Sequence, residues 1–259
     1  GRVLHTLNAP ATGTFIAPTV IKASGIADMT REVFGPVLHV ATFKSRDLDK
    51  IIGDINATGY GLTFGLHTRI DDRVQQVVEQ IDAGNIYVNR NQIGAVVGSQ
   101  PFGGEGLSGT GPKAGGPMYM PRFAATVDYP VASKDPVDLP GPTGESNRLS
   151  AHPRGVILCL GPDAERQADR VRALGGTAEI VHGDVVAKNL ETRPCAAVVW
   201  HGDAQTARAY EQALAKRSGA IVPLITGDID AGHVLHERHI CVDTTAAGGN
   251  AALLAEMGA

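Results

Sequence analysis

Short apolar runs alternate with helical stretches through the second half of the chain, and this alternation restricts the fold more than any other feature. The apolar runs are bounded by turn residues and predict strands, whereas the stretches between them carry apolar residues at helical spacing. We expect strands over 155–160, 178–181, 196–200 and 220–225, and helices over 163–174 and 204–217. Strands and helices in this order form a doubly wound α/β domain, which we place at residues 151–236.

A nucleotide-binding turn is missing from this predicted domain. Its first strand is followed by Gly161-Pro162-Asp163-Ala164, with one glycine where the pyrophosphate turn of a dinucleotide fold needs three at fixed spacing. We therefore predict a Rossmann-like domain with a structural role rather than a cofactor-binding one. A free-standing Rossmann-type binding protein is disfavoured on the same ground.

The first half of the chain also mixes strands with helices. We expect strands over 15–21, 37–43, 62–68 and 85–89, and helices over 48–56 and 71–81. Four prolines and two glycines between 130 and 144 break both patterns, so we predict a linker at 130–150. The predicted organisation is an α/β domain at 1–129, the linker, the Rossmann-like domain at 151–236 and a terminal part at 237–259.

The charge and composition exclude several classes of partner. A net charge of −4 leaves no basic field for nucleic acid and no polybasic patch for anionic lipid. No apolar run approaches the roughly 20 residues that a membrane-spanning helix needs. The three cysteines show no metal-binding spacing, which favours a reduced cytoplasmic protein.

Glycine is concentrated in one stretch. Nine of the 32 glycines fall between Gly94 and Pro117. Three prolines in or beside this stretch, Pro101, Pro112 and Pro117, stiffen it, which favours an ordered functional loop over a flexible connection. Successive backbone N–H groups without side-chain cover can form a concave nest for an anion.

The segment Glu32-Val33-Phe34-Gly35-Pro36-Val37 combines a carboxylate with an aromatic ring two residues later. A carboxylate can accept hydrogen bonds from two vicinal ribose hydroxyls, while the ring offers an apolar wall. Taken alone, the segment is explained more simply by an exposed glutamate and a core phenylalanine.

Several segments together resemble the aldehyde dehydrogenase superfamily. The segment 32–37 is similar to its E-x-F-G-P-V element, and 56–62 and Pro101-Phe102-Gly103-Gly104 follow at the expected intervals. Four segments resemble one branch of the superfamily, the glutamate-semialdehyde dehydrogenases of the proline utilization A family. These segments are 55–63, 84–91, 100–117 and the terminal 244–251.

The resemblance implies a cofactor, a substrate and residues for each. Glu32 would bind the nicotinamide ribose of NAD and Phe34 would pack near the nicotinamide. The substrate would be glutamate γ-semialdehyde, oxidised to glutamate after an FAD-dependent proline dehydrogenation in the parent polypeptide. Gly94 and Ala95 would hold its α-carboxylate and α-amine, and Phe102 would pack on its aliphatic stem. The family also implies a homo-oligomer.

One departure from the family concerns the nucleophile. Aldehyde dehydrogenases attack the aldehyde with a cysteine thiolate that precedes the E-x-F-G-P-V element, and no cysteine precedes Glu32 here. Cys159, Cys195 and Cys241 are interpreted as buried structural thiols. We therefore expect a C-terminal fragment of the parent enzyme, with no catalytic residue of its own and inactive alone. The alternative is a non-catalytic module for assembly and for covering a substrate channel.

Two other features of the sequence are a set of three histidines and the small, polar terminal segment. His233, His236 and His239 have helical spacing, but a glycine and a β-rich run flank them, so no metal site is predicted. The resemblance implies that the terminal segment 244–251 covers an internal tunnel. It also suggests that 130–236 is an inserted domain, whose flanks 122–127 and 238–243 would pair as a two-stranded flap.

Overall fold

The computed structural model describes residues 2–123 and 135–245. The chain divides into two compact units, Gly1–Thr58 and Gly59–Ala259, each described by itself. This division differs from the predicted boundary at 129/130. The physical reason is strand pairing, because strands from both halves of the sequence share one sheet in the second unit.

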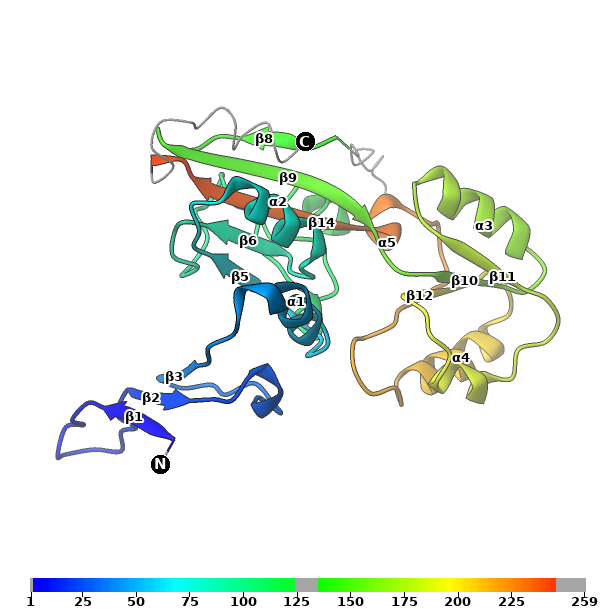
Figure 1. The fold of residues 1–259 in the computed structure, drawn as a ribbon. Helices are drawn as coiled ribbons and strands as arrows, with labels where there is room; N and C mark the ends of the chain where they lie inside the picture. Colours follow the sequence, from blue (N-terminus) through cyan, green and yellow to red (C-terminus); the bar gives the residue numbers. More distant parts are fainter. Residues whose placement is uncertain (1, 124–134, 246–259) are drawn as a thin grey trace. The chain divides into compact units, whose positions relative to one another are not determined.

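The first unit is a small three-stranded sheet followed by a helix (Figure 1). Strand β1 (Val3–Thr6) pairs antiparallel with β2 (Thr19–Lys22), which pairs parallel with β3 (Val37–Val40). Two 3₁₀ turns, η1 (Ile26–Asp28) and η2 (Ser45–Asp47), and helix α1 (Leu48–Asn56) complete it. The helix confirms the predicted range.

This unit has almost no core of its own. Of residues 2–58, only Ala23 and Ile52 are buried. Ten large apolar side chains are exposed: Val3, Leu4, Leu7, Phe15, Ile16, Val33, Phe34, Leu38, Val40 and Phe43. Apolar surface on this scale is typical of a part that packs against further protein.

The second unit is built on a five-stranded mixed sheet in the order β5-β6-β14-β9-β8. Strands β5 (Thr63–Leu66) and β6 (Asn85–Val88) are parallel and joined by helix α2 (Asp71–Gln80), as predicted. Strand β14 (Leu235–Asp243) lies parallel to β6. Strands β4 (Tyr60–Gly61) and β7 (Glu105–Gly106) pair antiparallel and form a separate two-stranded sheet.

Part of the predicted linker is a pair of strands. Strand β8 (Val137–Leu139) pairs antiparallel with β9 (Glu145–Pro153), and β9 pairs antiparallel with β14 over nine residues. Strand β14 contains the segment 238–243 of the predicted flap, and over 239–242 it is a central strand, paired with β6 on one edge and β9 on the other. Residues 124–127 lie outside the described part of the chain, as do 246–251 of the terminal segment.

A four-stranded parallel sheet follows in the order β11-β10-β12-β13. Its strands are β10 (Ile157–Leu160), β11 (Ala178–Val181), β12 (Ala197–Trp200) and β13 (Leu224–Ile225). Its helices are α3 (Ala164–Ala173), the 3₁₀ helix η4 (Ala187–Glu191) and α4 (Ala204–Leu214). The prediction placed β10, β11, β12, α3 and α4 to within three residues at each end, whereas η4 was not predicted and the expected strand 220–225 forms only at its last two residues.

Alternate residues of β10 explain why helices cover both faces of this sheet. Ile157 and Cys159 pack with Val171 of α3, whereas Leu158 and Leu160 pack with residues of α4. All four strand residues are fully buried, and complete burial of such a side chain contributes about 2 kcal/mol relative to exposure.

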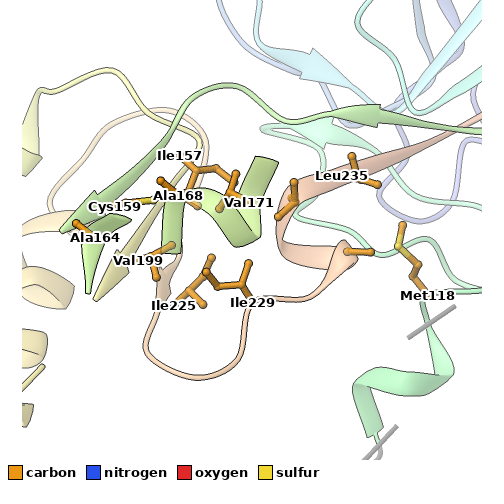
Figure 2. Packing of buried hydrophobic residues seen from close by; sticks show 13 residues of the cluster. Met118, Ile157, Cys159, Ala164, Ala168, Val171, Val199, Ile225, Ile229 and Leu235 are labelled. Atoms are coloured by element: carbon orange, nitrogen blue, oxygen red, sulfur yellow. The ribbon is translucent and has the colours of Figure 1, made fainter. Parts of the chain in front are cut away.

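The parallel sheet is inserted between two paired strands. Because Pro153 and Leu235 face each other at one end of the β9–β14 ladder, the chain leaves and returns at the same place. Helix α5 (Ala231–Val234) leads into β14, and its neighbour Leu235 joins the same core cluster as Ile157, Val199 and Met118 (Figure 2). Met118 precedes the 3₁₀ turn η3 (Met120–Phe123), so this core unites the inserted part with the first half of the chain.

Candidate functional site

The candidate site is a long loop that starts where β6 ends. Asn89 has φ +58° and turns the chain away from the strand, while its Oδ1 accepts a hydrogen bond from the Thr68 N–H, 2.9 Å away, just beyond β5. The carboxyl ends of β5 and β6 therefore meet at the beginning of the loop. Ligands of α/β sheets commonly bind at this edge.

Gly94 and Ala95 present two free amides on the loop. Gly94 is exposed with φ +74°, and a Cβ built there would meet no atom within 4 Å. Their N–H groups have no hydrogen-bond partner among the residues that the structure describes. Two consecutive donors in open space can bind an anion such as a carboxylate.

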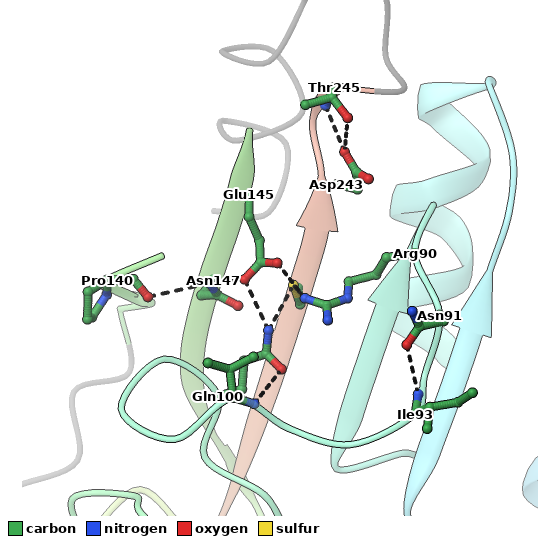
Figure 3. Close-up of polar contacts among 11 residues, drawn as sticks. Arg90, Asn91, Ile93, Gln100, Pro140, Glu145, Asn147, Asp243 and Thr245 are labelled. Atoms are coloured by element: carbon green, nitrogen blue, oxygen red, sulfur yellow. Dashed lines mark hydrogen bonds and ion pairs between the residues drawn. The ribbon is translucent and has the colours of Figure 1, made fainter. Parts of the chain in front are cut away.

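The amides on either side of this pair are already used. The Ile93 N–H donates to Asn91 Oδ1 at 3.1 Å, and the Val96 N–H donates to Gln100 Oε1 at 3.1 Å (Figure 3). Gln100 also donates its own N–H to the Val96 carbonyl at 2.9 Å. Within residues 93–96, side chains thus engage the two outer N–H groups and leave those of Gly94 and Ala95 available.

Phe102 is held farther along the same loop. Its N–H and carbonyl both bond to Ala114, at 3.0 and 2.9 Å, which closes the loop on itself. The buried Asn85 donates to the Pro101 carbonyl at 2.8 Å and accepts from the Gly103 N–H at 3.1 Å. Phe102 is left half-buried, with its backbone fixed on both sides.

A buried lysine completes this support. Lys113 Nζ donates to Asn85 Oδ1 at 2.8 Å and to the Gly103 carbonyl, while its N–H donates to Glu237 Oε2 at 2.8 Å. Burial lowers the pKa of Lys113 to about 8, opposed by the nearby charge of Glu105. Gly84 allows this approach, because a Cβ there would lie 2.1 Å from the Gly103 oxygen.

The residues predicted to contact the cofactor lie in the first unit. Glu32 is exposed, and Phe34 is 92% exposed. Both side chains are accessible to a ligand.

The three cysteines are unsuited to nucleophilic attack. Burial raises the pKa of Cys159 and of Cys241 to about 11, and it also raises the pKa of the half-buried Cys195. A neutral buried thiol is a poor nucleophile at physiological pH.

The three histidines do not converge. Among residues 2–123 and 135–245, no group of three or more His, Cys, Asp and Glu side chains is arranged to hold a metal ion. His233 caps helix α5 instead, with its ring 3.1 Å from Asp230. Burial lowers the pKa of His236 to about 3 and that of His239 to about 4.

The sequence patterns did not indicate the residues that support the loop. Asn85, Gln100 and Lys113 are polar and buried, and their roles depend on contacts made across the sheet and loop. The one local signal is that Asn85 begins an otherwise apolar strand.

Comparison with known proteins defines the family. The model of the aldehyde dehydrogenase family matches residues 2–127, which include the loop, Glu32 and Phe34. This part of the chain belongs to the aldehyde dehydrogenase family. In the described part of the chain, no helix has the length and apolar character needed to cross a membrane.

The relatives extend the likeness into the second half. The bifunctional protein PutA of Escherichia coli K12 is 38% identical over 319 aligned positions, covering 93% of this chain. The 1-pyrroline-5-carboxylate dehydrogenase of Bacillus cereus is 44% identical over 110 positions, covering 42% of this chain and 21% of that protein. The chain spans about a quarter (24%) of the length of the curated PutA relatives that it matches.

A solved structure shares the fold of nearly the whole chain. Proline utilization A from Corynebacterium freiburgense superposes with a TM-score of 0.70 at 25% identity, covering 92% of this chain and 29% of that one. The inserted parallel sheet and the aldehyde dehydrogenase part therefore occur together in a known protein.

Proposed function

We propose that this chain is the distal part of an NAD-dependent L-glutamate γ-semialdehyde dehydrogenase in a bifunctional proline catabolic polypeptide. An FAD-dependent proline dehydrogenase of the same polypeptide would supply the substrate. The observation that carries the proposal is the pair of free amides at Gly94 and Ala95, on a chain similar to PutA and to 1-pyrroline-5-carboxylate dehydrogenase.

The substrate's chemistry fits this loop. The Gly94 and Ala95 N–H groups donate to the substrate α-carboxylate, and the Phe102 ring packs on the aliphatic stem that joins the carboxylate to the aldehyde. An aromatic face excludes water beside that stem and holds the aldehyde at a fixed distance from the anion site. An aldehyde without an α-carboxylate would gain nothing from the two amides.

Glu32 and Phe34 fit the nicotinamide end of NAD. The exposed carboxylate can accept hydrogen bonds from both ribose hydroxyls, and the 92% exposed ring of Phe34 can cover the nicotinamide. When bound, NAD⁺ supplies the oxidant that removes hydride from the substrate carbon. The nucleophilic thiolate comes from outside this chain, because the pKa values of its own cysteines are raised by burial.

We propose a structural role for the inserted Rossmann-like domain. The turn after β10 is covered by the Trp200 ring, since a Cβ on Gly161 would lie 2.5 Å from that ring and one on Gly202 would lie 2.3 Å from it. A cavity of about 600 Å³ lies beside this turn, lined by Gly161, Trp200 and His182 among others. The ground for a structural role is the turn itself, which has one glycine where a pyrophosphate turn needs three. Free thiols in the described chain agree with a cytoplasmic enzyme.

The test uses the working enzyme, meaning this chain joined to the upstream dehydrogenase segment that the proposal requires. It should form NADH from glutamate γ-semialdehyde with a much lower KM than from propanal, which lacks the carboxylate. Equal KM values for the two aldehydes would refute the proposed anion site. The chain alone should form no NADH from either aldehyde.

The alternative is an assembly module that covers the channel and has no chemistry. The ten exposed apolar side chains of the first unit favour packing against further protein, which both functions require. The alternative predicts that Glu32→Gln and Gly94→Ala leave the kinetics of the working enzyme unchanged. The dehydrogenase proposal predicts a higher KM for NAD⁺ and for the semialdehyde, respectively.

A further inference from the structure

Glu145 joins the two ends of the loop that carries the free amides. It is the first residue of β9, and its side chain is 15% exposed. Its Oε2 accepts from Arg90 Nη1 at 2.5 Å, and its Oε1 accepts from Gln100 Nε2 at 3.0 Å (Figure 3). Arg90 stands immediately before residues 91–99 and Gln100 immediately after them, so one carboxylate ties both ends of the loop.

Gln100 links Glu145 to the backbone next to the Gly94 and Ala95 amides. While its Nε2 is held by Glu145, its Oε1 accepts from the Val96 N–H at 3.1 Å. Val96 directly follows Ala95. The peptide group between Ala95 and Val96, which follows the one carrying the Ala95 N–H, is therefore oriented by a chain of two side-chain hydrogen bonds that begins at Glu145.

The carboxylate itself is held by rigid elements. Asn147 Nδ2 donates to Glu145 Oε1 at 2.8 Å from the same strand. Arg90 Nη1 also donates to Cys241 Sγ at 3.1 Å, and Cys241 lies opposite Asn147 in the β9–β14 ladder. Paired strands fix side chains more accurately than loops do.

We propose that Glu145 is a positioning residue, which holds the Gly94 and Ala95 amides in the geometry that binds the substrate carboxylate. The strands that flank the inserted domain then contribute to substrate affinity, although they do not contact the substrate. This inference rests on the proposed function.

The first test is steady-state kinetics of Glu145→Gln in the working enzyme. Glutamine keeps the size of the side chain but loses the charge that pairs with Arg90. We expect the KM for glutamate γ-semialdehyde to rise about tenfold, equivalent to about 1.4 kcal/mol, with kcat changed less than about twofold. The kcat/KM for propanal should stay unchanged, because propanal does not use the two amides.

The matched control is Glu179→Gln. Glu179 forms an ion pair of similar length with Arg193, at 2.6 Å, on the inserted domain. This variant should leave both KM values at the wild-type level. A semialdehyde KM that is unchanged in Glu145→Gln, in an enzyme whose wild type is active, would overturn the positioning role.

Hydrogen exchange measured on this chain separates the inference from the proposed function. In Glu145→Gln, peptides covering residues 91–99 should exchange about tenfold faster, because the Val96 N–H loses its fixed acceptor. Unchanged exchange there would overturn the positioning role of Glu145 even if the enzyme is active. An inactive wild type with faster loop exchange in the variant would refute the dehydrogenase proposal and support the positioning role of Glu145.

A second variant guards against misfolding of the first. Gln100→Leu removes the tether to Val96 and leaves the Arg90–Glu145 ion pair in place. It should show the same rise in the KM for the semialdehyde and the same increase in the hydrogen-exchange rate of residues 91–99 as Glu145→Gln. A wild-type KM in this variant would contradict the route through Gln100.

Discussion

Replacing His239 with leucine should remove part of the acid sensitivity of the second unit. His239 is fully buried in β14, between Asn85 of β6 and Leu149 of β9. Burial, together with the positive charge of Lys113, lowers the pKa of His239 to about 4 from an ordinary value of 6.5. Arg90 adds to the lowering and Glu145 opposes it.

The sign follows from the protons bound in each state. Between about pH 6.5 and pH 4 the unfolded chain binds a proton at this histidine and the folded chain does not, so the free energy of unfolding falls as the pH falls. At about pH 5 the difference amounts to about 2 kcal/mol, since one pKa unit is worth about 1.4 kcal/mol. His236, with a pKa of about 3, adds a loss of about the same size.

The assay is urea unfolding followed by far-UV circular dichroism at several pH values between about 7.5 and 5. His239→Leu should lose about 2 kcal/mol less than the wild type over this range. Val242→Ala, which removes apolar volume from the same strand, should lower stability at every pH without changing the pH dependence. If His239→Leu kept the full wild-type pH dependence, the buried neutral imidazole would not be its source.

Three further predictions concern the loop, the shared core and the inserted domain. Gly94→Ala should raise the semialdehyde KM about fivefold or more, because the left-handed φ of +74° costs alanine about 1–2 kcal/mol and moves the amides. The control is Gly219→Ala, which should leave KM unchanged. Gly219 has φ +92°, and a Cβ there would also meet no atom within 4 Å. Met118→Ala should destabilise by about 2–5 kcal/mol in urea unfolding, whereas Met120→Ala, 72% exposed, should change stability by less than about 0.5 kcal/mol. Saturable quenching of Trp200 fluorescence by NADH in this chain would contradict the structural role of the inserted domain, for which no quenching is expected.

The spacing of apolar residues was enough to predict those helices and strands whose structure depends on their own residues. Helix α1 spans the predicted range because apolar residues recur on one face, and β11 also matches its prediction. The sequence of β9, Glu-Ser-Asn-Arg-Leu-Ser-Ala-His-Pro, shows no regular apolar alternation and follows a run of prolines and glycines. It is a strand because β14, about 90 residues later, pairs with it along its full length.

The same distinction holds for the candidate site. Gly94, Ala95 and Phe102 were predicted from the resemblance to the family, and the structure places all three on one loop. Glu145 and Gln100 lie 45 positions apart in a sequence that gives no sign of their contact. Only the sheet order, which sets β9 beside β14 and β14 beside β6, makes that contact predictable.

The two strands around the insertion support the loop from separate positions. From β9, Glu145 ties the ends of 91–99, whereas from β14, Glu237 accepts the Lys113 N–H and thereby fixes the part that carries Phe102. A module that only covers a channel would not need these two buried carboxyl groups bonded to the loop, because burying a carboxyl group costs free energy unless it is hydrogen-bonded. These strands therefore support both parts of the loop that carries the proposed substrate site, and the inserted domain is joined to them through the core shared by Met118 and Leu235.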